Sequence, residues 1–77
     1  MNIYHLINTG GYTGMDSYDG FVVRAKSPKQ ARELAAEQDR TQPETWRDAK
    51  LSSCERLGTC PGVRNFAEVI LGSFNAG

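Results

Sequence analysis

The chain lacks a net charge, a long hydrophobic run and a cluster of histidines or cysteines. Nine Lys and Arg residues balance nine Asp and Glu residues over 77 positions. A protein that binds nucleic acid usually carries a basic excess, and one that imitates DNA needs an acidic excess. The charge balance therefore argues against nucleic acid as a partner.

The apolar residues are spread too thinly to cross a membrane. No segment reaches the roughly 18 consecutive apolar residues of a membrane span, and the first eight residues are too short for the apolar core of a signal peptide. We therefore expect a cytoplasmic protein with no membrane partner. In that compartment Cys54 and Cys60 are expected to be thiols.

The length predicts a single domain over residues 1–77. A domain of this size buries only about 60% of the surface that its unfolded chain exposes, and its stability is marginal. A homodimer is therefore an open possibility.

Two strands and the stretch between them make up the first third of the chain. Residues Asn2–Asn8 alternate in the manner of a strand, and the β-branched run that starts at Phe21 predicts a second strand to about Ala25 or Lys26. The intervening sequence GGYTGMDSYDG is longer than a usual hairpin loop of 2–5 residues. Tyr12, or residues 17–19, could extend the strands into it.

A capping box predicts the start of a helix. In the sequence SPKQ, Ser27 can accept from the backbone of Gln30, whose side chain can reach back, and Pro28 suits the first helical position. The helix should end near Gln38. Its apolar stripe is narrow and small, which favours close packing on a sheet with Leu34 as the main anchor.

The second half of the chain predicts two more strands. A polar segment over residues 39–50 holds at most one helical turn at Pro43, with Trp46 folded back on the core. Residues 51–57 can form a third strand, and the dipeptide at 61–62 is a turn signal. Residues 68–74 form the last strand, with Phe74 expected in the core and with Ser73 and Asn75 facing the other way.

The predicted fold is α+β, with the order β-β-α-β-β. The simplest architecture is a four-stranded, mainly antiparallel sheet with one helix on one face. Loops, Trp46 or a second subunit would then cover the other face, and an uncovered apolar face would favour a dimer.

Two blocks of the sequence resemble small uncharacterised accessory proteins of bacteriophages and prophages. The first is GGYTGMDSYDGFVVRAKSPKQAREL, with its glycine-rich loop, Val-Val-x-Ala strand and Ser-capped helix; the second is the ending LGTC…EVILGSFNAG. The longer loop around Met15 departs from the shorter acidic loop of that group. The resemblance implies a phage or prophage origin, an accessory role and action inside the host cell, and it implies no activity.

The usual chemical motifs are weak in this chain. Cys54 and Cys60 are separated by five residues and His5 is distant in the sequence, which does not match a zinc site. His5 lies within an alternating strand, where a structural histidine is the simpler interpretation, and Asp16 with Asp19 would need a pocket to act as an acid–base pair. Helix capping accounts for Ser27 without an anion. We predict no catalytic residues, no metal site and no cofactor.

The aromatic side chains of the glycine-rich stretch are the informative feature. Turn chemistry explains its glycines and aspartates. It does not explain its tyrosines and methionine, which are typical of recognition surfaces and which could equally cap one end of the core. The residues predicted to bind a partner are Tyr12, Met15, Asp16, Tyr18, Asp19, Trp46, Ser73 and Asn75.

Three functional hypotheses follow. The favoured one is a phage accessory protein, comparable in role to anti-CRISPR proteins, that binds a host protein such as a defence component. The alternative is an oligomeric binder, or sponge, for a nucleotide signal, with aromatic rings stacked on the base. A small enzyme has the least support. The residues predicted to meet phosphates in the alternative are Arg24, Arg47, Arg56 and Arg64.

Overall fold

A computed structural model describes residues 1–10, 17–59 and 67–75 of the chain. Its elements follow the order β1 (Asn2–Asn8), β2 (Ser17–Ala25), α1 (Pro28–Gln38), α2 (Pro43–Arg47), β3 (Ser52–Thr59) and β4 (Glu68–Asn75). The predicted α+β class and the order of the main elements are confirmed, and the helical turn at Pro43 is a second, short helix.

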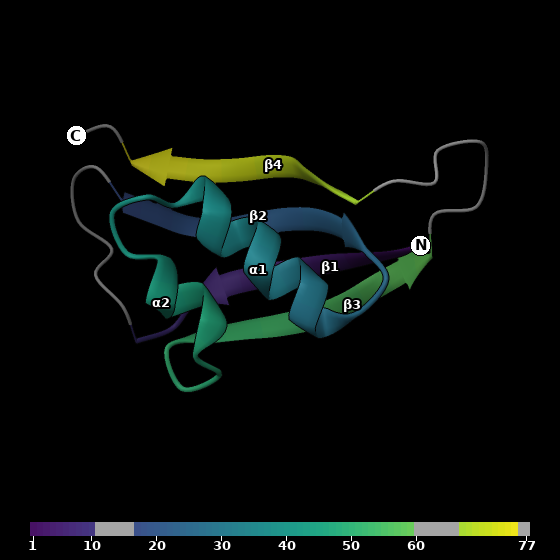
Figure 1. The fold of residues 1–77 in the computed structure, drawn as a ribbon, viewed down its shortest axis with the longest axis horizontal. Helices are drawn as coiled ribbons and strands as arrows, with labels where there is room; N and C mark the ends of the chain where they lie inside the picture. The colour runs from purple at the N-terminus through teal and green to yellow at the C-terminus, as the bar shows by residue number, and fades with distance from the viewer. Residues whose placement is uncertain (11–16, 60–66, 76–77) are drawn as a thin grey trace.

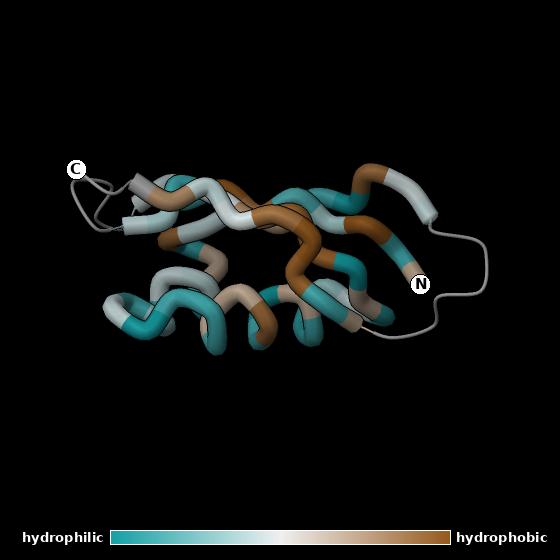
Figure 2. Tube along the Cα trace, turned by 90° about the horizontal axis from the view of Figure 1, so that it is seen from above, coloured by the Kyte–Doolittle hydropathy of each residue, from teal (hydrophilic) through white to brown (hydrophobic). Residues whose placement is uncertain are grey.

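One sheet contains the four strands in the order β3-β1-β2-β4, and every pair is antiparallel. The two central strands therefore come first in the chain, and the later strands add one to each side (Figure 1). Both helices lie on the same side of this sheet (Figure 2). We call that side the helix-covered face and the opposite side the open face.

The core lies between the sheet and α1. Strand pairing places Tyr4 opposite Val23 and Leu6 opposite Phe21, and all four side chains are buried on the helix-covered face. This alternation is what the period of two in β1 predicted. The buried apolar set is Tyr4, Leu6, Phe21, Val23, Ala25, Ala31, Ala35, Ala36 and Trp46.

Helix α1 begins as the capping box predicted, with one difference. The Gln30 backbone N–H donates to Ser27 Oγ at 3.2 Å, but the Gln30 side chain accepts from the backbone N–H of Lys26 at 2.7 Å rather than from that of Ser27. The helix buries three alanines, and Leu34 is only half-buried. Small side chains allow α1 to lie close to the sheet, so the prediction of Leu34 as main anchor is wrong.

Arg32 connects both helices to the sheet. Its guanidinium donates from Nη1 to the Trp46 carbonyl at 3.0 Å and to Ser52 Oγ at 2.8 Å, and from Nη2 to the Ser52 carbonyl at 3.1 Å. The planar fork of Arg suits such a set of acceptors. It fixes α2 against the start of β3.

Strand β2 begins at Ser17, so the strand extends into the glycine-rich stretch as one of the two sequence interpretations allowed. The pairing of β2 with β4 shifts twice, between Tyr18 and Gly20 and between Val22 and Val23. At the first shift Asp19 is the extra residue on β2, and at the second Ile70 is the extra residue on β4. Each shift is a β-bulge, which bends the strand and redirects nearby side chains.

Candidate functional site

The strand register brings together two parts of the predicted binding set. Ser17 pairs with Asn75, Tyr18 with Phe74 and Gly20 with Ser73, so the start of β2 lies beside the end of β4 (Figure 1). We call this part of the sheet, formed by residues 18–19 and 73–75, the loop end. The sequence predicted its residues separately and did not predict that they meet.

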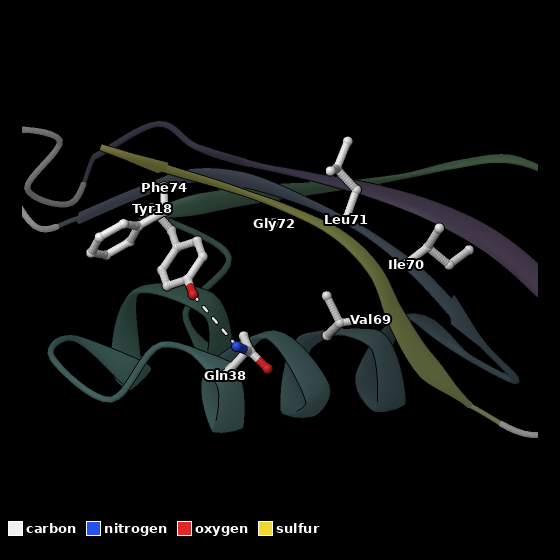
Figure 3. Close-up of a pocket in the computed structure, with 7 residues that line it drawn as sticks. All are labelled: Tyr18, Gln38, Val69, Ile70, Leu71, Gly72 and Phe74. Carbon is white, nitrogen blue, oxygen red and sulfur yellow. Dashed lines mark hydrogen bonds between the residues drawn. The ribbon is translucent and has the colours of Figure 1, made fainter. Parts of the chain in front are cut away.

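Tyr18 is held in place by other rings and remains half-buried. Its ring stacks on Phe21, with centroids 4.5 Å apart and planes at 28°, and meets Phe74 at 4.9 Å and 59°. The Gln38 amide makes a long hydrogen bond of 3.5 Å to the Tyr18 hydroxyl, which points toward α1 (Figure 3). Tyr18 therefore contributes to the core and to the surface together.

Asp19 occupies the bulge of β2 and is half-buried. Its neighbours Tyr18 and Gly20 pair with Phe74 and Ser73, which are consecutive residues of β4, so Asp19 is the additional residue of β2 at this shift. The Asn8 amide donates to the Tyr18 carbonyl at 3.4 Å beside it. Bulges recur next to functional sites because they change the direction of a side chain.

A groove of about 310 Å³ lies between α1 and β4 (Figure 3). Val69 points from β4 toward α1, whereas Leu71 points away from the helices, to the open face. None of the described residues that line the groove carries a charge. The lining residues are Tyr18, Gln38, Val69, Ile70, Leu71, Gly72 and Phe74.

Strand β4 exposes large apolar side chains at the edge of the sheet. Ile70 is 48% exposed, Leu71 62% and Phe74 47%. The prediction that Phe74 belongs to the core is therefore wrong. Among the described residues β4 is an edge strand, so the Phe74 ring contacts Tyr18 on the β2 side and stays half exposed.

Trp46 does not belong to a binding surface, and that prediction is wrong. Its side chain is 0% exposed, and its ring meets Phe21 edge-on with centroids 4.8 Å apart. The indole Nε1–H donates to the buried Asp39 carboxylate at 2.8 Å. A tryptophan whose ring is packed and whose N–H has an acceptor is part of the core. This agrees with the sequence prediction that Trp46 folds back on the core.

The arginines of the phosphate hypothesis do not converge in the described part of the chain. Arg24 on β2 is 5% exposed and forms an ion pair with Glu68, so it is not an accessible phosphate ligand. Arg56 lies on β3, at the opposite edge from the groove. Arg47 lies on α2, and Arg64 lies outside the described residues.

Arg47 is also engaged with carboxylates. Its Nη1 donates to Glu44 at 2.6 Å and its Nε to Glu33 at 3.1 Å. These hydrogen bonds, that to Glu44 first and that to Glu33 second, raise the pKa of Arg47 above its usual value. An incoming phosphate would have to compete with both carboxylates.

The remaining chemical candidates are dispersed. His5 is half-buried on the open face, opposite Val22 and Glu55. Cys54 is a half-buried thiol, and burial raises its pKa, with a smaller opposing effect from the charge of Arg32. Within residues 1–10, 17–59 and 67–75, no three His, Cys, Asp or Glu side chains gather in a group that could hold a metal ion.

Several predicted site residues lie outside the described residues: Tyr12, Met15, Asp16 and Cys60. For Asn75 the structure gives only the backbone pairing with Ser17. Conversely, sequence reasoning missed Gln38, Ile70 and Leu71 as surface residues. The sequence feature that could have indicated Ile70 and Leu71 is that their strand is apolar and carries a single charge, at its first position.

No protein-family model, curated protein or solved structure matches this chain. The resemblance to phage accessory proteins therefore stays a prediction from two sequence blocks. In the part of the chain that the structure describes, no helix is long and apolar enough to span a membrane.

Proposed function

We propose that this protein is a non-enzymatic accessory protein of a phage or prophage that binds a host protein through its loop end. The observation that best supports the proposal is the register between β2 and β4. It joins the half-buried Tyr18 and Asp19 to Ser73 and Asn75, which the sequence had marked independently.

The loop end has the physical character of a contact surface. Tyr18 is fixed between Phe21 and Phe74, so a partner would meet a ring whose freedom is already restricted. A side chain ordered beforehand loses less entropy on binding. Aromatic side chains of this kind dominate the energetics of many protein interfaces.

The alternative of a nucleotide sponge has less support. Of its proposed phosphate ligands, Arg24 and Arg47 are committed to carboxylates, and Arg56 lies on the far edge of the sheet. Trp46, which would stack on a base, is buried. We favour a host protein as the partner. The resemblance to phage proteins suggests a component of host defence as its class.

The test is affinity capture from a lysate of the host bacterium with three immobilised proteins. They are the wild type, the double variant Asp19→Ala with Ser73→Ala, and the control Lys29→Ala, whose side chain is exposed at the start of α1. We expect one host protein to be enriched by the wild type and by the control. The loop-end variant should lose most of that enrichment.

Two results would contradict the proposal. One is that no host protein is enriched over an unrelated protein of the same size. The other is that the loop-end variant, shown to be folded by circular dichroism, retains the same partner as fully as Lys29→Ala does. Direct titration of the purified partner then separates a loss of affinity from a loss of folded protein.

A further inference from the structure

The two edge strands of the sheet differ in how they are protected against pairing with another chain. Strand β3 exposes adjacent charges at Glu55 and Arg56, a common protection for an edge. Strand β4 carries its only charge at Glu68, its first residue, and that carboxylate pairs with Arg24. From Val69 to Asn75 the strand contains no charge and no proline.

The outer side of β4 has no partner strand among the described residues, since β2 is its only neighbour there. An edge strand presents backbone N–H and C=O groups that can extend the sheet. Beside this edge lies the uncharged groove between β4 and α1. A strand added to β4 would place alternate side chains into that groove, and uncharged side chains fit its lining best.

The sequence of β4 itself meets these requirements. We propose that a second copy of this chain pairs antiparallel with β4, in a register centred on Gly72. In this register Ile70 of one copy lies opposite Phe74 of the other, and Leu71 lies opposite Ser73. Both Ile70 and Phe74 line the groove and are about half exposed in the single chain. Cross-strand pairs of an aromatic and a β-branched side chain are favourable.

Charge also selects this register. The two Glu68 residues fall at opposite ends of the paired strands, about 26 Å apart at about 3.3 Å per residue. A register centred on Leu71 would instead set Glu68 against the ring of Phe74. The dimer has an eight-stranded sheet with all helices on one face, and the two grooves meet at its centre. This pairing does not depend on the proposed function, because it requires no host protein.

The first test is sedimentation equilibrium of the purified full chain over a wide concentration range. We expect a reversible dimer for the wild type and for the matched control Leu57→Lys, which changes an exposed apolar residue on β3. Ile70→Lys and Phe74→Lys should each weaken the dimer roughly tenfold or more, since a charge would enter the uncharged groove. Circular dichroism establishes that each variant is folded.

The second test reads the register with a short thiol-specific cross-linking reagent, in a background of Cys54→Ser and Cys60→Ser. A mixture of the Leu71→Cys and Ser73→Cys proteins should cross-link efficiently. A mixture of Leu71→Cys with Ser53→Cys, on the other edge strand, should not.

A wild type that stays monomeric at every concentration overturns the proposal and leaves β4 free for a different protein. A dimer that survives Ile70→Lys and Phe74→Lys, or that is lost with Leu57→Lys, places the contact elsewhere and overturns it as well. A dimer that lacks the Leu71–Ser73 cross-link overturns the register.

Discussion

At the scale of the residue, one buried carboxylate organises the region around α2. Asp39 is 1% exposed and receives hydrogen bonds from the Thr41 backbone and hydroxyl, the Gln42 backbone and the Trp46 indole. Such a carboxylate is tolerated in the interior because its oxygens have donors. Trp46 is thereby a structural residue, although its aromatic character alone suggested a contact surface.

Replacing Trp46 with Phe should lower the free energy of unfolding by about 1–3 kcal/mol, because one buried carboxylate oxygen of Asp39 loses its indole donor. Urea unfolding followed by circular dichroism measures the change. Glu37→Gln, on the exposed side of α1, is the control. If the Trp46→Phe protein is as stable as that control, the Asp39–Trp46 hydrogen bond does not contribute measurably to the free energy of unfolding.

Burial raises the pKa of Cys54, so the folded protein holds the thiol proton more strongly than the unfolded chain does. The stabilisation from this shift is present below the pKa of the unfolded thiol and is lost as the pH rises through the folded pKa. In a Cys60→Ser variant, alkylation of Cys54 by iodoacetamide should therefore need a higher pH in buffer than in urea. Equal pH profiles in the two conditions would contradict the shift.

At the scale of the element, local signals predicted the helices and strands well. The capping box located α1, alternation of side chains located β1 and β4, and a β-branched run located β2. The exposure of Phe74 and the bulge at Ile70 could not be predicted from the sequence, because both depend on β4 being added beyond β2. The bulge breaks the simple alternation of β4, so that Val69 and Gly72 share the helix-covered face. The same long-range register creates the loop end.

The approach of β1 to β2 depends on Gly20, which lies next to the bulge at Asp19. A Cβ at this position would lie 2.6 Å from the backbone carbonyl oxygen of Leu6, whereas one at Gly58 would meet no atom within 4 Å. Gly20→Ala should therefore cost about 1–3 kcal/mol of stability by overpacking, and Gly58→Ala should be close to neutral. Thermal unfolding of the two variants tests the difference, and similar losses for both would contradict it.

At the scale of the whole molecule, both helices cover one face of the sheet (Figure 2), and among the described residues the other face is open and β4 forms an apolar edge with no outer strand. Small domains are marginally stable as single chains. Pairing along this edge would bury additional apolar surface of the same chain. An antiparallel dimer would carry its two loop ends at opposite ends of the paired β4 strands. A dimeric or repetitive host protein could then be held by both loop ends, with a gain in avidity.

In our proposal β4 is the surface by which a second copy of this chain is bound. Hydrogen–deuterium exchange of the wild type at low and high protein concentration tests it most directly. We predict that amides within residues 68–75 become more protected as the concentration rises, while those within residues 52–59 of the charged edge β3 do not change. Exchange in β4 that is independent of concentration, or protection that grows on β3 instead, would contradict the account.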